Sequence, residues 1–169
     1  MALFFDTTID SAGALRGDVQ QAVAKATHIF AIWELSRYAN ATVGSVSWDE
    51  LDHATRDLAG EHDVDADSSR DLVDQVVNDL INELPAGGIT KTVTMAWGDN
   101  FADAEPDSAE IMICGGGPTV RLVFDFAAHG TIDADSLELH HSWGVDSGVL
   151  RFSDEHEEAA VFVAEYLTS

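Results

Sequence analysis

The chain has 169 residues, 46% of them hydrophobic, so it is long enough to bury one sizeable core and fits one domain, 1–169, better than two. Its 31 acidic residues against 8 basic ones give a formal charge of −23, which argues against direct binding to nucleic acid or anionic lipid, because no basic patch is present to neutralise phosphates. No segment approaches the roughly 18 uncharged residues of a membrane span, and no basic region precedes the short apolar run at the start. We therefore expect a cytoplasmic protein without a membrane partner.

Residues 1–88 are predicted to form the helical part of the domain. In the first helix, 18–39, Asp18 and Gln21 have capping-box spacing and apolar residues recur at helical intervals. The second half of this helix, "HIFAIWEL", is apolar nearly all round. We expect it to run through the core.

Two more helices are expected before the first glycine-rich turn. One begins at Ser47, with Glu50 three positions on, and continues to about Gly60. The other covers 69–84, with Ser68 as a suitable cap and a single apolar face. The sequence "PAGG" at 85–88 ends it.

After Gly88 the hydrophobic period changes from helical to alternating, so 89–169 is predicted as a β-meander with a closing helix. Strands are expected at 89–97, 109–114, 118–127, 135–143 and 148–152, with a hairpin loop around His129 and Gly130 joining the third to the fourth. Ser153 is expected to cap a helix over 154–167. Helices first and strands second predict an α+β fold, with N-terminal helices packed on an antiparallel sheet.

The stretch "EHDVDADSSRDLVD", Glu61 to Asp74, resembles a calcium loop in its spacing of carboxylates. Its oxygen ligands would be Asp63, Asp65, Asp67, Asp71 and Asp74. However, Ser68 stands where a glycine permits the sharp turn, and Asp74 stands where a longer glutamate closes the site. The sequence favours a capped acidic loop with no metal or other cofactor, and a calcium-binding module stays open as an alternative.

The β-rich half offers one polar sheet face. Alternation along a strand sends His140 and His141 to opposite faces, so the two rings cannot jointly bind one metal ion. His140 falls beside Glu138 and is expected to approach Arg121 on the neighbouring strand, which makes these three residues an alternative binding site. Whether a second copy covers the exposed strand edges stays open.

No arrangement of residues in the sequence indicates catalysis. No serine lies in a Gly-x-Ser-x-Gly elbow, and carboxylates are so numerous that an acid–base pair can always be imagined. We therefore expect a protein that is not an enzyme.

Two explanations of the charge remain. Aspartate outnumbers glutamate 20 to 11 and lysine occurs only at Lys25 and Lys91, which resembles haloarchaeal proteomes and would make the acidity an adaptation to salt. Alternatively, carboxylates about 5 Å apart along helices imitate the phosphates of a DNA strand and bind a host nucleic-acid-binding protein or complex. The partner-binding residues would be Asp49, Glu50, Asp52, Asp57, Asp63, Asp65, Asp67, Asp71, Asp74 and Glu83.

The stretch "AEIMICGGGPTVRLV", Ala109 to Val123, with "WG" at 143–144 and an acidic C-terminal helix, resembles a set of small phage-encoded proteins with a Glu-Ile-x-Ile-Cys-x-Gly-Gly-Pro-x-Val-Arg core. The match covers about the last 60 residues. The resemblance implies a viral or mobile-element setting, and small acidic phage proteins include inhibitors of restriction enzymes and CRISPR complexes that imitate DNA. The leading hypothesis is therefore such an inhibitor, and the alternative is a halophile's cytoplasmic protein of unknown binding function.

Overall fold

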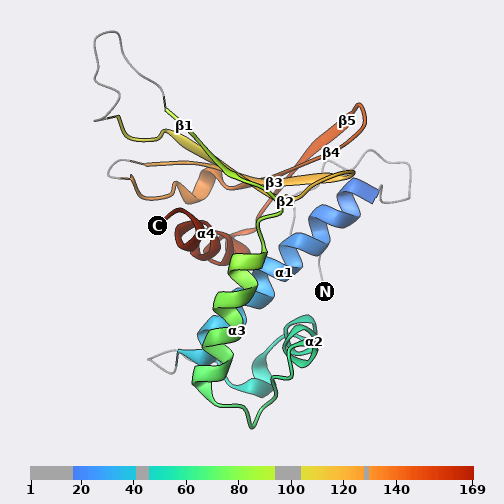
Figure 1. The fold of residues 1–169 in the computed structure, drawn as a ribbon, viewed down its shortest axis with the longest axis vertical. Coiled ribbons are helices and arrows are strands. Elements are labelled where there is room, and N and C mark those ends of the chain that lie inside the picture. Colours follow the sequence, from blue (N-terminus) through green and yellow to red (C-terminus); the bar gives the residue numbers. More distant parts are fainter. Residues whose placement is uncertain (1–16, 41–45, 94–103, 128–129) are drawn as a thin grey trace.

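The computed structural model describes residues 17–40, 46–93, 104–127 and 130–169, and it confirms the α+β class. Figure 1 shows one twisted sheet with helices gathered on one of its faces and with α2 and α3 extending away from it. The helices are α1 (Gly17–Ala39), the 3-10 turn η1 (Trp48–Glu50), α2 (His53–Glu61), α3 (Arg70–Glu83), the 3-10 turn η4 (Ala134–Ser136) and α4 (Asp154–Thr168). The strands are β1 (Ile89–Thr92), β2 (Ser108–Cys114), β3 (Thr119–Asp125), β4 (Glu138–Trp143) and β5 (Asp146–Arg151).

Helix α1 runs through the core, as its sequence predicts. More than half of its 23 residues are buried, and it contacts α2, α3, α4, β3 and β4. One detail of the prediction is wrong: Asp18 is not a cap before the helix but lies inside its first turn, where it is 1% exposed. Its carboxylate lies 2.8 Å from His141 Nδ1.

The predicted helix from Ser47 to Gly60 is divided in two. The capping box of Ser47 and Glu50 is present, but it starts only the single turn η1. Leu51 then takes an extended backbone conformation and is buried, and Asp52 caps a new helix, α2, by accepting a hydrogen bond from the Ala54 N–H (2.9 Å). An aspartate that is a good N-cap competes with continuation of the helix before it.

Helix α2 is fixed to α1 by a buried carboxylate. Glu34, in the second half of α1, accepts hydrogen bonds from the Asp52 N–H (3.0 Å) and from the Thr55 hydroxyl. Thr55 is fully buried. Helix α2, which carries Asp57 and Glu61, therefore has a defined position on the core.

Helix α3 begins one residue later than predicted. Its N-cap is Ser69, whose hydroxyl accepts from the Leu72 N–H (3.3 Å). Ser68 does not cap the helix because its hydroxyl is hydrogen-bonded to Asp65 in the preceding loop. The predicted apolar face is confirmed for Val73, Val77, Leu80, Ile81 and Leu84, which are buried, but Leu72, predicted on the same face, is exposed.

The five strands form one antiparallel sheet in the order β1-β2-β3-β4-β5. Side chains alternate between its two faces. The inner face lies toward α1 and α4 and carries the buried residues Ala109, Ile111, Ile113, Val120, Leu122, Phe124, Leu139, His141 and Leu150. The outer sheet face carries Glu110, Met112, Arg121, Val123, Glu138, His140, Val149 and Arg151, and no described helix covers it (Figure 1).

The predicted strands agree with the observed ones apart from their ends. The expected strand 89–97 is β1 over its first four residues, and its end falls in 94–103, outside the described residues. β3 and β4 form the expected antiparallel pair, although η4 interrupts their connection; His129 lies outside the described residues. The segment "GGGP" is the expected turn between strands, and Gly116, at φ +104, has a backbone conformation that favours glycine.

Helix α4 closes the fold at the predicted place. Ser153 stands at its N-cap position, but the hydroxyl lies 2.9 Å from His156 Nδ1 and makes no capping hydrogen bond. The His156 ring is buried against Phe30 of α1, with ring centroids 4.4 Å apart. In the described part of the chain, none of the helices has both the length and the apolar character required of a membrane-spanning segment.

Candidate binding surfaces

The ten acidic residues predicted to bind a partner all lie on η1, α2, α3 and the segments between them. We call them the α2–α3 acidic surface: Asp49, Glu50, Asp52, Asp57, Asp63, Asp65, Asp67, Asp71, Asp74 and Glu83. Nine are exposed and Asp52 is half-buried. In Figure 1, α2 and the start of α3 lie far from the sheet, whereas the end of α3, at Glu83, lies close to it. The structure therefore brings nine of these carboxylates to η1, α2, the first half of α3 and the segments between them, while Glu83 lies apart at the other end of α3.

Few basic groups neutralise this surface. The segment from residue 49 to 83 contains only two arginines, and the guanidinium of one of them, Arg70, lies 3.7 Å from the centre of the Tyr38 ring. His53 Nδ1 lies 2.7 Å from the Asp57 carboxylate, in a pair that is largely exposed. Exposed pairs of this kind are weak. Most of the negative charge is consequently presented to solvent.

Three of the ten carboxylates have structural roles. Glu50 accepts hydrogen bonds from the Ser47 N–H (2.8 Å) and hydroxyl, and the backbone hydrogen bond is the main cause that lowers the pKa of Glu50. Asp52 caps α2. Asp65 accepts from the Asp67 N–H and the Ser68 hydroxyl, each at 3.0 Å. A test of partner binding should therefore leave these three residues in place.

The loop that resembles a calcium site is organised by its own hydrogen bonds. Asp65 is directed at Asp67 and Ser68, Asp63 has φ 58, and Val64 between them is buried. Among the described residues, no group of three or more His, Cys, Asp or Glu side chains could hold a metal ion. The Asp65 carboxylate is therefore already engaged within the loop, and calcium binding at this loop stays an alternative prediction.

The three residues of the alternative site do come together on the outer sheet face. Arg121 and His140 are direct cross-strand partners, and His140 Nε2 lies 3.0 Å from Glu138 Oε2. Two further residues join them: Arg151 Nε donates to Glu138 Oε1 (2.8 Å), and Arg121 Nε lies 3.4 Å from Glu110 Oε1. We call these five residues the sheet-face cluster. Sequence reasoning missed Glu110 and Arg151 because their strand registers were not known.

Glu138 is the centre of this cluster. Burial disfavours its carboxylate, but hydrogen bonds from His140 and Arg151 outweigh burial and lower the pKa of Glu138 below its ordinary 4.5. The stabilisation from this group is present above pH 4.5 and is lost as the pH falls through the lower pKa of the folded state.

We expect Arg151→Gln to raise the pKa of Glu138, because the substitution removes both a hydrogen bond and a positive charge. A titration of the side-chain carboxyl carbons by NMR measures this directly. Arg56→Gln, which removes the same charge from the exposed surface of α2, is the control and should leave the pKa of Glu138 unchanged. An unaltered Glu138 titration in Arg151→Gln would contradict the assignment of this hydrogen bond.

A buried polar pair joins the start of α1 to the sheet. Asp18 Oδ2 lies 2.8 Å from His141 Nδ1, and their side chains are 1% and 4% exposed. Gly148 is the cross-strand partner of His141, and a Cβ added there would lie 2.8 Å from the ring. His141 itself is buried on the inner sheet face. Its partner is 123 residues away in sequence, so no local pattern indicates the pair.

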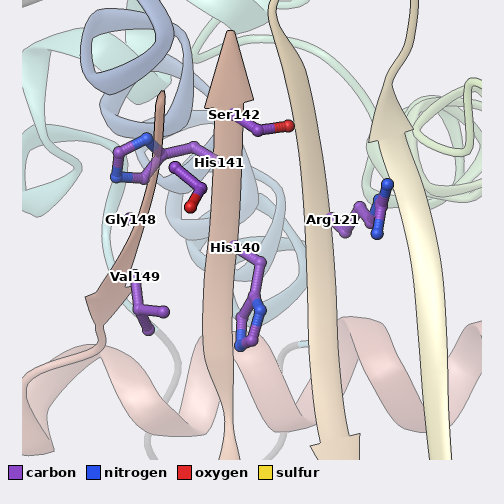
Figure 2. A pocket seen from close by; sticks show the side chains of 7 residues that line it. Arg121, His140, His141, Ser142, Gly148 and Val149 are labelled. Carbon is purple, nitrogen blue, oxygen red and sulfur yellow. The ribbon is translucent and has the colours of Figure 1, made fainter. Parts of the chain in front are cut away.

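A hollow of about 180 Å³ lies over β3, β4 and β5 (Figure 2). Its lining residues are Arg121, His140, His141, Ser142, Ser147, Gly148 and Val149. None of the seven is acidic. The hollow adjoins the sheet-face cluster through Arg121 and His140, while Glu138 lies outside its lining.

Comparisons with protein-family models, with curated proteins and with solved structures find no match to this chain.

Proposed function

We propose that this protein is a non-enzymatic acidic binding protein that docks its α2–α3 acidic surface on a positively charged, nucleic-acid-binding surface of another protein. The observation that supports this most is the gathering of nine carboxylates, eight of them exposed, on η1, α2, the first half of α3 and the segments between them. Such a field attracts a cationic partner and speeds association.

The charge is concentrated as well as large. Residues 49–83 contain twelve acidic residues and two arginines, so 35 of the 169 residues supply −10 of the formal charge of −23. Along α3, Asp71, Asp74 and Asp79 recur at roughly one per helical turn, or about 5 Å along the axis. This spacing is comparable with that of phosphates along a DNA strand.

A viral or mobile-element setting, and restriction enzymes or CRISPR complexes as the partner class, are part of the same proposal. They rest on the resemblance of Ala109 to Val123 to small phage proteins. The competing explanation is adaptation to a salt-rich cytoplasm, in which acidic residues anywhere on the surface are equivalent. The two explanations differ in whether the position of an acidic residue on the surface affects binding to a partner.

The test uses two variants that remove the same charge from different places. The first is Asp63→Asn, Asp67→Asn, Asp74→Asn and Glu83→Gln, four exposed positions of the acidic surface that cap no helix. The matched control is Glu105→Gln, Asp135→Asn, Glu158→Gln and Glu165→Gln, four exposed positions on the other half of the chain. Each is compared with the unmodified protein for displacement of a fluorescent DNA duplex from restriction enzymes and CRISPR effector complexes.

We expect the unmodified protein and the control to displace the duplex and the first variant to need at least about tenfold more protein, because association depends on the local field. Equal loss in both variants would indicate a general charge effect and would favour salt adaptation. Absence of displacement by the unmodified protein across the set would contradict the proposed function.

A further inference from the structure

The lining of the hollow over β3–β5 is rich in hydrogen-bond donors. Arg121 supplies a guanidinium, His140 an imidazole, and Ser142 and Ser147 hydroxyls, and no lining residue is a carboxylate. Ser142 and Ser147 are cross-strand partners, as are Arg121 and His140, so the donors come from three adjacent strands. Guanidinium and hydroxyl groups together are typical of sites for carboxylate and phosphate oxygens.

The nearby carboxylates are already engaged. Glu138 contacts His140 through one oxygen and Arg151 through the other, and Glu110 is paired with Arg121. Their negative charge is thus compensated within the sheet-face cluster. Apart from Glu83 at the end of α3, the α2–α3 acidic surface lies away from the sheet, and charges more than about 10 Å apart are largely screened at 0.1 M salt.

The Arg121–Glu110 pair is loose. Arg121 Nε is shielded from solvent, yet at 3.4 Å from Glu110 it makes no hydrogen bond with any described group, and the two side chains are 41% and 39% exposed. Figure 2 shows the guanidinium directed away from β4. A shielded donor without an acceptor is unfavourable. An anion bound in the hollow would supply an acceptor for this guanidinium and would compete with Glu110 for it.

We propose that this hollow binds a single oxyanion group, a carboxylate or a phosphate, held by Arg121, His140, Ser142 and Ser147, with Glu110 competing for Arg121. The volume of about 180 Å³ is below the roughly 300 Å³ at which drug-sized pockets begin. It corresponds to about six water molecules. The ligand is therefore a small anion, or the anionic end of a longer molecule whose remainder lies in solvent.

The experiment is an NMR titration of amide and imidazole resonances with inorganic phosphate and, in parallel, with acetate. The pH is held constant and ionic strength is kept at about 0.3 M with potassium chloride, so that general screening does not change. We expect saturable shifts at His140, Ser142 and Ser147, with a dissociation constant on the order of a millimolar. Saturation by one anion alone assigns the site to that class, and saturation by both assigns it to oxyanions in general.

Three variants test the assignment. Arg121→Gln should weaken binding at least about tenfold, while Arg56→Gln, with the same loss of charge on the exposed surface of α2, should bind as the unmodified protein does. Glu110→Gln should bind about fivefold more tightly, because the competitor is removed.

The proposal is overturned if neither anion gives a saturable shift up to about 50 mM, if Arg121→Gln binds as well as the unmodified protein, or if Glu110→Gln does not bind more tightly. Since none of these residues belongs to the α2–α3 acidic surface, either proposal can fail without the other.

Discussion

Replacement of Asp18 by alanine is expected to lower the free energy of unfolding by about 3 kcal/mol. The substitution leaves His141 Nδ1 buried without its partner, and both side chains are almost fully removed from water. For a chain of this length, a loss of that size corresponds to a fall of roughly 6–12 °C in Tm. Chemical denaturation followed by circular dichroism measures the free energy, and a thermal scan measures Tm.

The matched control is Asp71→Ala. Asp71 also lies in the first turn of a helix but is exposed, so its loss removes only a favourable interaction with the helix dipole, about 0.3–1 kcal/mol. A double-mutant cycle of Asp18→Ala with His141→Leu should show a coupling energy above about 1 kcal/mol. Equal losses for Asp18→Ala and Asp71→Ala, together with additivity in the cycle, would show that the buried pair does not stabilise the fold.

Gly148→Ala is expected to destabilise the protein by about 2 kcal/mol, because its new Cβ would lie 2.8 Å from Cε1 and Nε2 of His141. The ring cannot easily withdraw, since Asp18 holds its other nitrogen. The measurement is again denaturant unfolding. In a His141→Ala background the penalty should disappear, because the group that the Cβ meets has been removed.

Gly60→Ala is the control for this substitution. No atom lies within 4 Å of a Cβ added at Gly60, and the residue is helical, so alanine there should be neutral or should stabilise by up to about 1 kcal/mol. If Gly148→Ala proved as well tolerated as Gly60→Ala, the close packing of β5 against His141 would be contradicted.

Regular patterns made much of this fold predictable. The apolar stripe of α3 and the alternation of β2, β3 and β4 each repeat over several residues, so they indicate both the element and its buried face. The break between η1 and α2 was not predicted, because it depends on a choice between two good N-caps, Ser47 and Asp52, and on burial of Leu51. Burial of one side chain against another element is not visible in a local pattern.

The same distinction holds for the candidate sites: local sequence properties indicated some of their residues, whereas residues brought together by packing were not predicted. The acidic stretch and the three residues Arg121, Glu138 and His140 were accessible to sequence reasoning because charge density and strand alternation are local properties. The contact between Asp18 and His141 was not, because it requires the packing of a helix end on a strand 123 residues later. Nor could the sequence show that the acidic surface and the sheet-face cluster lie on different parts of the molecule.

The separation of these two regions gives the protein an electrical polarity. Residues 49–83 carry −10 in 35 residues, whereas the other 134 residues share −13 and the sheet-face cluster contains two arginines against two glutamates. In the field of a cationic body, such a molecule experiences a torque and turns before contact, with α2 and α3 leading. The outer sheet face would then point away from the first partner, so a second ligand could reach it while the first remains bound.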